Sequence, residues 1–366
     1  MYAESELPKY PPVFVVRITD SIRRRLTKIS RQFTHPNVIM LEQIQNIWIL
    51  GAISVAADLG LADLLKNGPK TIAELASLTG MLEDPLYRIM RLLASEGIFK
   101  ERKDKRFYNT PVSESLLEDE LKYFVLHTLN KLQFQVSGEM IHSVKTGEST
   151  LGLFIKNNAF DHIGQSEELN DLYNKAMTNT SKMQIAAILS VFDFGKFNHI
   201  VDIGGGTGLI LSTILSKYKE IKGTLFDLPH VVDNSKDLIK DQDILNRLKI
   251  IAGTFFETMP EGGDLYMMKN ILHCWNDENS IKILQNIRKI LPQKGKLLII
   301  ETIIKNDNKP SFGKMTDIYM MVGLGGRERT EKEYRILLKR AGFRIEKIIP
   351  TVSPLSLIVA IPDWGG

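Results

Sequence analysis

The sequence predicts an α/β protein in which a mainly helical N-terminal domain precedes a doubly wound sheet that ends in an antiparallel hairpin. Three observations support this prediction. Apolar residues recur at helical spacing through the first half of the chain. From His199 onward, short apolar runs alternate with helical segments, which is typical of a parallel sheet flanked by helices. Only a few residues separate the last two runs, whereas a parallel crossover needs about a dozen or more, so these runs must form a hairpin.

The composition is that of an ordinary globular protein. The chain has 366 residues and a formal net charge of +4, and 43% of its residues are hydrophobic. This length suits two or three domains. The single cysteine excludes an intramolecular disulfide framework and a cysteine-rich zinc site, and it favours a cytoplasmic protein. We find no apolar run that approaches the roughly 20 residues of a membrane span, so we expect no transmembrane segment.

Residues 1–36 are predicted to form an N-terminal arm that is rich in proline at first and basic later. The stretch "RITDSIRRRLTKISRQ" is interpreted as a solvated helix or a tail without fixed structure. The alternative is a contact with a partner chain, an acidic membrane surface or nucleic acid.

Residues 37–115 are predicted to form a winged-helix domain, in which two capped helices precede a β-hairpin. The helix "TIAELASLTG" begins with a capping box at Thr71 and ends at a glycine. The helix "DPLYRIMRLLASEG" repeats this plan, with Asp84 as its N-cap and Gly97 as its stop. The segment "IFKERKDKRFYNT" alternates about a charged turn, which predicts the hairpin. Because the second helix has little polar surface for reading bases, we favour a structural or dimerisation role over DNA binding.

Residues 116–190 are predicted to be a helical linker with a glycine-bearing loop region in its middle. Its last part, "SEELNDLYNKAMTNTSKMQIAAILSVF", is predicted to form a long amphipathic helix pair that leads into the next domain.

Residues 191–366 are predicted to form the domain that contains the sheet. Five parallel strands are expected at residues 199–205, 221–227, 248–254, 264–270 and 296–302. The closing hairpin is expected from "FRIEKIIP" and "SLIVAIP", after the helix "EKEYRILLKRAG".

A glycine-rich turn follows the first predicted strand. Gly204, Gly206 and Gly208 form a GxGxG pattern, and their lack of side chains lets a ligand approach the backbone closely. A helix follows, so its N-terminus faces whatever binds there. Position 209 is Leu209 rather than the third glycine of the dinucleotide fingerprint, and the lysine of a P-loop is missing. Asp227 ends the second strand, where a carboxylate can accept hydrogen bonds from a ribose diol.

Five motifs follow one another along the chain: "VDIGGGTG", "FDLPHVV", "KNILHCWNDE", "ILPQKGKLLIIE" and "GGRERTEKEY". In these motifs, over roughly residues 37–362, the chain resembles the O-methyltransferase family that includes plant caffeate O-methyltransferases, vertebrate hydroxyindole O-methyltransferase and bacterial antibiotic O-methyltransferases. The resemblance implies a Rossmann-like catalytic domain that binds S-adenosylmethionine (SAM), with S-adenosylhomocysteine (SAH) as product. It also implies a homodimer formed through the winged-helix domain, and an acceptor pocket to which residues 116–190 contribute.

The resemblance assigns the cofactor to residues on several strand ends and on one preceding helix. They are Ser181, Asp202, Gly204, Gly206, Asp227, Leu228, Thr254, Phe255 and Lys269. Asp202 and Gly204 would line the methionine end of SAM, and Lys269 the region near its sulfonium. Thr254 departs from the family pattern, which has an aspartate contacting the adenine amine at this position; threonine can form a hydrogen bond there but adds no charge.

The chemistry of methyl transfer to oxygen calls for a base. A phenol with a pKa of about 10 is a poor nucleophile until it is deprotonated, and a histidine with a pKa of about 6.5 can take its proton. The resemblance gives this role to His273, with Glu301 and Glu328 as the carboxylates that orient the imidazole. The remaining histidines lack metal-ligand spacing with carboxylates, so we expect no metal.

The side chain of Cys274 follows the proposed base directly. Adjacent side chains point in different directions on most backbones, so we expect His273 not to activate the thiol, and we interpret Cys274 as a residue that sets acceptor specificity. The family usually has an aspartate at this position. Asn276 is predicted to cap the helix that follows. Candidate residues of the acceptor pocket, by motif matching, are Tyr173, Met177, Asn270, Cys274, Tyr319 and Met320.

The sequence thus predicts a SAM-dependent O-methyltransferase that acts on a hydroxyl of a small aromatic or polyketide-like metabolite, as a homodimer in secondary metabolism. Two alternatives remain open. One is a relative that binds SAM without transferring its methyl group and catalyses hydroxylation or decarboxylation. The other is a winged-helix regulator that binds DNA, although we expect no nucleic-acid partner.

Overall fold

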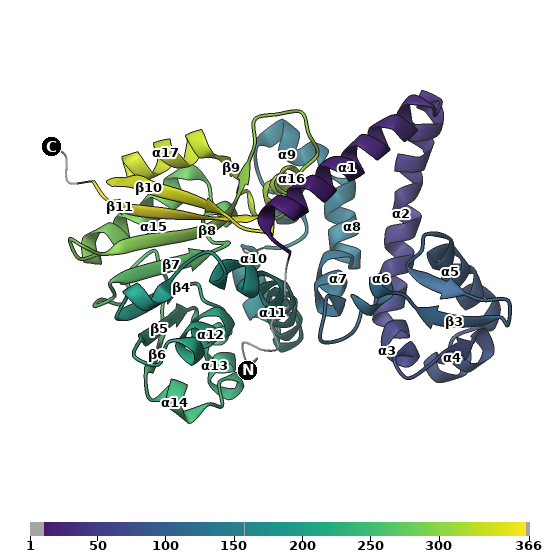
Figure 1. Ribbon diagram of the computed structural model, residues 1–366, viewed down its shortest axis with the longest axis horizontal. Helices are drawn as coiled ribbons and strands as arrows, with labels where there is room; N and C mark the ends of the chain where they lie inside the picture. The colour runs from purple at the N-terminus through teal and green to yellow at the C-terminus, as the bar shows by residue number, and fades with distance from the viewer. Residues whose placement is uncertain (1–10, 157, 364–366) are drawn as a thin grey trace. The chain divides into compact units, whose positions relative to one another are not determined.

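The computed structural model describes residues 11–156 and 158–363, so the first ten residues of the predicted arm lie outside it. The chain divides into two compact units. One consists mainly of Phe14–Phe134 with Asp171–Thr180, and the other mainly of Gln135–Asn170 with Ser181–Gly366. Each unit is described by itself (Figure 1). The four domain boundaries expected from the sequence stay a prediction.

The first unit contains the winged-helix elements in the expected order. They are α2 (Pro36–Asp58), α3 (Leu61–Leu65), β1 (Lys70–Thr71), α4 (Ile72–Thr79), α5 (Glu83–Ser95), β2 (Phe99–Glu101) and β3 (Arg106–Asn109). The small antiparallel sheet has the strand order β1-β3-β2. The capping box of α4 is present between Thr71 and Glu74, as predicted. These elements enclose their own apolar core, to which Leu75, Met90 and Phe107 contribute.

One cap of this domain was predicted wrongly. Helix α5 begins at Glu83 with Leu82 as its N-cap, so Asp84 is not the cap. Asp84 instead lies in the first turn, where its negative charge faces the positive end of the helix dipole. Gly97 follows the end of α5 with φ +72°, which confirms it as the stop.

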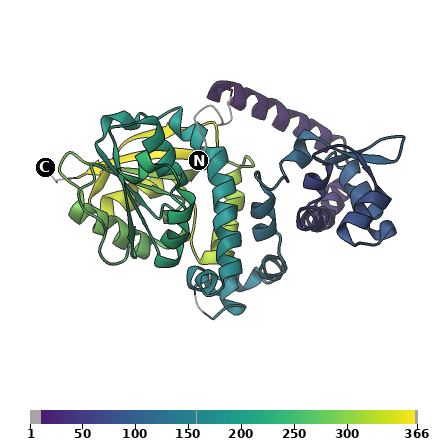
Figure 2. The same ribbon diagram turned by 90° about the horizontal axis from the view of Figure 1, so that it is seen from below.

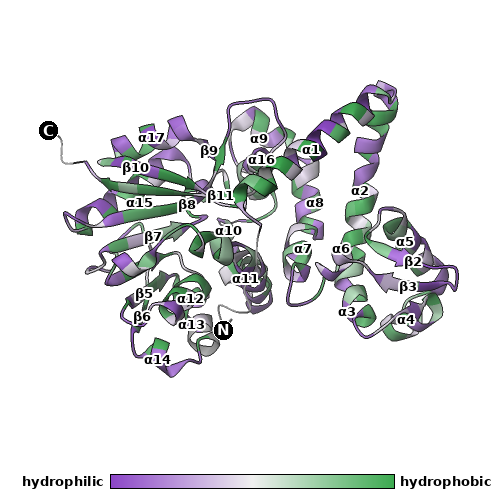
Figure 3. Cartoon of the chain, in the orientation of Figure 1, coloured by the Kyte–Doolittle hydropathy of each residue, from purple (hydrophilic) through white to green (hydrophobic). Residues whose placement is uncertain are grey.

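Two long helices of this unit expose apolar side chains. Helix α1 (Val13–Gln32) carries Phe14, Ile18, Ile22, Leu26 and Ile29 on its surface. Helix α2 passes the length and composition test for a membrane span, with a mean hydropathy of 1.5 in its most apolar window. The expectation that no apolar run approaches a membrane span overlooked this helix, in which Gln43, Gln45 and Asn46 interrupt the apolar residues. One such helix is weak support for a membrane protein. Figure 3 shows hydrophobic positions along both helices.

The second unit is built on the predicted sheet. Its strands are β4 (His199–Ile203), β5 (Lys222–Asp227), β6 (Leu248–Ala252), β7 (Leu265–Lys269), β8 (Lys296–Ile304), β10 (Phe343–Pro350) and β11 (Leu355–Pro362). Their order is β10-β11-β8-β7-β4-β5-β6. β4 to β8 pair in parallel, whereas β11 pairs antiparallel with both β8 and β10, so the terminal hairpin is confirmed. The short strand β9 (Arg329–Thr330), which pairs in parallel with β8, was not predicted.

Helices cover both faces of this sheet (Figures 1 and 2). They include α11 (Glu167–Leu189), α12 (Leu209–Lys217), α13 (Pro229–Leu238), α15 (Asp277–Ile290), α16 (Phe312–Leu324) and α17 (Glu331–Arg340). Helix α11 is one continuous helix, so the predicted helix pair at this place is wrong. Within this helix the hydroxyl of Thr180 donates to the Met177 carbonyl at 2.9 Å, so the polar residue is accommodated without a break.

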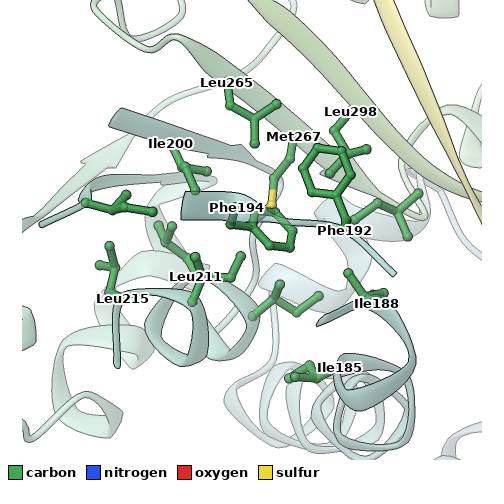
Figure 4. Close-up of a cluster of buried hydrophobic side chains, with 14 of the residues drawn as sticks. Ile185, Ile188, Phe192, Phe194, Ile200, Leu211, Leu215, Leu265, Met267 and Leu298 are labelled. Carbon is green, nitrogen blue, oxygen red and sulfur yellow. The ribbon is translucent and has the colours of Figure 1, made fainter. Parts of the chain in front are cut away.

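Each face of the sheet has its own apolar core. On one face, Ile185 and Ile188 of α11 and Leu211 of α12 meet side chains of β4, β7 and β8 (Figure 4). On the other face, Ile283 of α15 and Leu338 of α17 pack against the same strands. Because every central strand is buried on both faces, its sequence reads as a continuous apolar run.

The sheet has a topological switch point between β4 and β7. From β4 the chain moves outward to β5 and β6, and then crosses to β7 and β8 on the other side. Ile203 at the end of β4 lies opposite Met268 near the end of β7. Ligands of doubly wound folds bind at this place, beyond the carboxyl ends of the strands.

Candidate functional site

The glycine-rich turn lies directly after β4, at the switch point. Gly204 and Gly206 have φ values of +66° and +60°, which favour glycine. A Cβ atom on Gly204 would lie 2.4 Å from Cδ1 of Ile271, so this glycine lets the turn pack against the segment after β7. A Cβ atom on Gly206 would meet nothing within 4 Å, so the backbone there is open to a ligand.

Asp227 holds this turn through its carboxylate. One oxygen accepts the Gly206 amide at 2.7 Å and the other accepts the Leu228 amide at 2.7 Å. Two hydrogen bonds leave further lone pairs on the carboxylate, so the acid can still accept from a diol. Asp227, Gly206 and Leu228, which were predicted as one group, lie together.

Asp202 and Lys269 bring two buried charges to the same strand ends. Burial, together with the Asp227 charge, raises the pKa of Asp202 to about 7, although Lys269 opposes this shift. Burial lowers the pKa of Lys269 to about 8, against the attraction of Asp202 and Glu301. The pKa values of both side chains therefore lie close to neutral pH.

Lys269 also connects this edge to α11. Its Nζ donates to Oε1 of Gln184 at 3.2 Å. Ser181 lies three residues before Gln184, on the same helix face, which brings it toward the strand ends. Phe255 belongs to an aromatic group with Phe256 and Trp275, in which the Phe256 and Trp275 ring centroids are 4.8 Å apart. Thr254 starts the loop after β6, and its hydroxyl accepts the Phe256 amide at 3.4 Å.

The turn after β7 carries the proposed base. Asn270 takes a φ of +56°, which is uncommon for a residue with a side chain, and reverses the chain after β7. The 3₁₀ turn η4 (Leu272–Cys274) follows at once. Oε1 of Glu301 accepts the amides of Ile271 and Leu272, each at 2.9 Å. The carboxylate thereby replaces the backbone partners that a sharp turn lacks.

His273 is buried between both predicted carboxylates. Its Nδ1 lies 2.9 Å from Oε1 of Glu328 and 3.4 Å from Oε2 of Glu301. Burial alone would lower the pKa of His273, but the charge of Glu301, the neighbouring Cys274 and the hydrogen bond to Glu328 outweigh it and raise the pKa well above its usual value. Because both carboxylates meet Nδ1, the neutral imidazole carries its proton there and presents a free lone pair on Nε2.

Glu301 differs from expectation in one detail. It was predicted to end a strand, yet β8 continues to Ile304, where β9 pairs with it. The pairing of β9 explains the extension. Ser356 of β11 lies opposite Glu301 of β8 in the sheet, and the side chain of Glu301 is fully buried.

The set of His273, Glu301 and Glu328 has the composition of a metal site. One ligand-type atom of each lies within 4.8 Å of the other two. In this structure Oε1 of Glu301 accepts three backbone amides and Nδ1 of His273 lies at hydrogen-bond distance from Glu328, whereas Oε2 of each glutamate is buried without a hydrogen-bond partner among the described residues. The expectation of no metal stays a prediction.

Of the predicted acceptor residues, Cys274 and Tyr319 lie in the region of the proposed base. Cys274 is buried, and its Sγ approaches the Asn270 carbonyl at 3.5 Å. The thiol also contributes to the raised pKa of His273, so it lies near the imidazole. The expectation that His273 does not activate the thiol stays a prediction. Burial, with a further contribution from Cys274, raises the pKa of Tyr319 to about 12. Met320, on the same helix, is buried.

Tyr173 and Met177 lie in the middle of α11, in the other compact unit. There the ring of Tyr173 packs edge-on against His127 of α7 (Lys122–Thr128), with centroids 5.4 Å apart. The role of both residues toward an acceptor stays a prediction. Asn276 caps α15 as predicted, because its side chain accepts the Asn279 amide at 3.0 Å.

Sequence reasoning missed the residues that brace this turn from behind. Arg329 is fully buried and reaches the carbonyls of Leu272 and Trp275. Gly326 lies so close that a Cβ atom on it would be 2.1 Å from the His273 carbonyl oxygen. Asp317 accepts the Glu328 amide at 2.9 Å. In "GGRERT" no pattern distinguishes the buried Arg329 from Arg327, which is half exposed.

Comparisons with known proteins identify this arrangement. The O-methyltransferase domain model matches residues 134–344, and the O-methyltransferase dimerisation domain model matches residues 41–119. The chain belongs to the O-methyltransferase family. It is a SAM-dependent O-methyltransferase, and this result favours the main interpretation over a non-methylating relative or a DNA-binding regulator.

Relatives of this methyltransferase match almost over their full length. Phenazine O-methyltransferase PhzM from Lysobacter antibioticus is 35% identical over 88% of this chain and 96% of that protein. The crystal structure of LaPhzM covers 90% of this chain and all of that one, with 34% identity and a TM-score of 0.85. The SAH-bound structure of CalO1, a methyltransferase in calicheamicin biosynthesis, covers 89% and 98% of the two chains, with 28% identity and a TM-score of 0.79.

Glu328→Gln tests the electrostatics of the base. We expect the substitution to lower the pKa of His273 by about one unit or more, because a neutral amide replaces the carboxylate nearest Nδ1. The pKa is measured by NMR titration of the histidine ring protons, with His273→Gln identifying the resonance. Glu331→Gln is the matched control, since Glu331 is exposed and pairs with Arg335. Equal His273 pKa values in the Glu328 variant and the wild type would contradict the prediction.

Proposed function

We propose that this enzyme methylates a hydroxyl group of a small aromatic or polyketide-like metabolite, with His273 as the general base. The observation that carries the proposal is the buried imidazole held by Glu328 and Glu301 directly beyond β7. Ile271 of the same turn packs against Gly204, so the base and the glycine-rich turn share one edge of the sheet.

The base acts on the acceptor hydroxyl. When bound, SAM supplies an electrophilic methyl group on a sulfonium. Nε2 of His273 takes the proton of the hydroxyl, because the oxygen is a poor nucleophile while it is protonated. The resulting imidazolium is stabilised where it forms, since both carboxylates already meet Nδ1. Glu301 additionally holds the backbone of the turn, so the imidazole keeps its direction as its charge changes.

The chain's own residues fit the cofactor. The open backbone at Gly206 accommodates a ligand, and the carboxylate of Asp227 beside it is suited to a ribose diol. Asp202 offers a buried carboxyl group for the amino group of the methionine part. Lys269 sits at the same edge with a pKa of only about 8, so its charge opposes a cationic sulfonium less than an ordinary lysine would. Ser181, Leu228, Thr254 and Phe255 complete the proposed cofactor site.

The acceptor is proposed to be aromatic. Trp275 follows Cys274 and stacks with Phe160, with ring centroids 6.0 Å apart, so an aromatic surface adjoins the base. Tyr319 keeps its hydroxyl neutral, because its pKa is about 12, and can donate a hydrogen bond to an acceptor oxygen. A relative acts on phenazines by name, which agrees with an aromatic acceptor in secondary metabolism.

The enzyme is proposed to work as a homodimer in the cytoplasm. The dimerisation model spans residues 41–119, which include most of α2. Trp48 of α2 is 71% exposed, and Ile44 and Met40 one and two turns earlier are 61% and 62% exposed. An apolar surface of this kind is typical of a subunit interface. The absence of a nucleic-acid partner stays a prediction.

His273→Ala tests the base. We expect methyl transfer to fall by about 100-fold or more, which is the usual contribution of a general base, while SAM affinity changes less than about two-fold. Transfer is measured with tritiated SAM on a panel of hydroxylated aromatic compounds that includes a hydroxyphenazine. His142→Ala is the control, because His142 lies on α9 (Ile141–Thr146), outside the turn after β7, and is only half-buried. Unchanged turnover in His273→Ala would refute the base, and no transfer to any compound by the wild type would refute the acceptor class.

The charge near the sulfonium is tested by comparing SAM with SAH. As pH rises through about 8, Lys269 loses its proton. The affinity for the cationic SAM should then rise several-fold more than the affinity for the neutral thioether SAH. Calorimetric titrations between pH 7 and 9 give the ratio of the two dissociation constants. In Lys269→Met we expect the ratio to change less with pH than in the wild type, since only Asp202 still titrates nearby, whereas exposed Lys294→Met should behave as wild type. A constant ratio in the wild type would exclude Lys269 from the sulfonium region.

Trp48→Glu tests the interface. A buried charge without a partner is costly, so we expect the variant to dissociate into monomers at concentrations where the wild type is dimeric. Sedimentation velocity gives the masses. Ile336→Glu is the control, since Ile336 is 51% exposed on α17, outside the dimerisation model. A monomeric wild type, or a dimeric Trp48→Glu, would refute the proposal.

A further inference from the structure

Arg329 is the least expected buried group of the site. Its guanidinium donates to the Leu272 carbonyl at 2.9 Å and to the Trp275 carbonyl at 2.9 Å. It also donates to Oδ1 of Asp277 at 2.8 Å and to the hydroxyl of Ser280 at 3.2 Å. The first two contacts lie on either side of His273 in the sequence. Arg329 therefore fixes the backbone that carries the base.

The contacts of Arg329 and Glu301 meet on the same residue. Glu301 accepts the Leu272 amide, and Arg329 donates to the Leu272 carbonyl. The backbone of the turn is thus held between a buried anion and a buried cation. Arg329 also lies next to Glu328, and the amide of Arg327 donates to the His273 carbonyl at 2.9 Å. One short segment consequently holds the side chain of the base through Glu328 and its backbone through Arg329 and Arg327.

The buried charges balance only when His273 is protonated. Glu301, Glu328 and Arg329 are all buried, and together they leave one negative charge beside a neutral imidazole. Protonation of His273 cancels this charge. Without Arg329, two negative charges would face the imidazole, and the set would hold its proton more tightly. Consistent with this, the charge of Arg329 lowers the pKa of Glu301, against the larger effect of burial.

We infer that Arg329 is a positioning residue for the reaction. It fixes the backbone of the turn that carries His273, and it weakens the proton affinity of the set formed by His273, Glu301 and Glu328. The inference rests on the proposed role of His273. Its consequence is that the imidazole is able to be neutral, and so to accept a proton, at a lower pH than two buried carboxylates alone would allow.

Other titratable groups surround this set from several elements. They are Cys274 on η4, Lys269 on β7, Asp277 on α15, Asp317 and Tyr319 on α16, and Tyr334 on α17. Burial, with the nearby carboxylates, raises the pKa of Tyr334 well above its usual value, so this hydroxyl stays neutral. Asp277 is half exposed and bonds to Arg329 directly, so it offsets part of the charge of the guanidinium.

Two variants separate the charge of Arg329 from the planar arrangement of its hydrogen-bond donors. We expect Arg329→Gln to raise the pKa of the His273 set by about one unit or more, read from the His273 ring resonances without SAM or acceptor. Arg329→Lys keeps the charge, so the pKa should stay within about half a unit of wild type, while kcat falls because the two carbonyls lose their donor. Arg335→Gln is the matched control, because Arg335 is exposed and pairs with Glu331.

Asp277→Asn keeps the test decisive if Arg329→Gln fails to fold. Once the half-exposed carboxylate of Asp277 is removed, the charge of Arg329 is less offset, so the pKa of His273 should fall by a few tenths of a unit. A rise or no change in Asp277→Asn, or a folded Arg329→Gln with an unchanged pKa, would overturn the inference. Retained turnover in His273→Ala would instead refute the proposed base, since the NMR titration reads Arg329 without turnover.

Discussion

The carboxylate of Glu301 is the interaction on which the site depends. From the centre of β8 it accepts three amides of the turn after β7 and faces the imidazole of His273. A turn this sharp leaves its amides without backbone partners, and a buried amide without a partner costs about 1–3 kcal/mol. The strand pairing of β7 with β8 puts the acid at this place, so the geometry of the base follows from the register of the sheet.

A buried carboxylate needs a counter-charge, and this need explains the rest of the site. Glu301 and Glu328 are both removed from water, which is costly for an anion unless a cation lies near. His273 supplies one positive charge when it is protonated, and Arg329 supplies another from the segment that also carries Glu328. The short strand β9 attaches this segment to β8. Thus the two-residue strand β9, which contributes little to the sheet, contains Arg329, the cation that balances the buried carboxylates.

The corrections concern features that local sequence patterns do not determine. Asp84 matches the composition of an N-cap, but the helix begins two residues earlier than that cap would place it, with the extended Leu82 as its N-cap. The predicted helix pair is one helix, in which the Thr180 hydroxyl bonds to a backbone carbonyl of the same helix. The length and hydropathy of α2 become clear only when the whole helix is considered, because polar residues interrupt its apolar positions.

The sequence by itself determined the order of the strands' apolar runs, the closing hairpin and the glycine turn, because strand length, glycine spacing and connection length are local properties. It also paired His273 with Glu301 and Glu328, though only through the family resemblance. Only the tertiary structure decided which arginine of "GGRERT" is buried, that β8 extends past Glu301, and that Cys274 lies beside the imidazole. The first two facts depend on contacts across the chain, because Arg329 reaches Leu272, 57 residues earlier, and pairs with Ile303 of β8. The place of Cys274 depends on the conformation of the turn after β7, which no local pattern encodes.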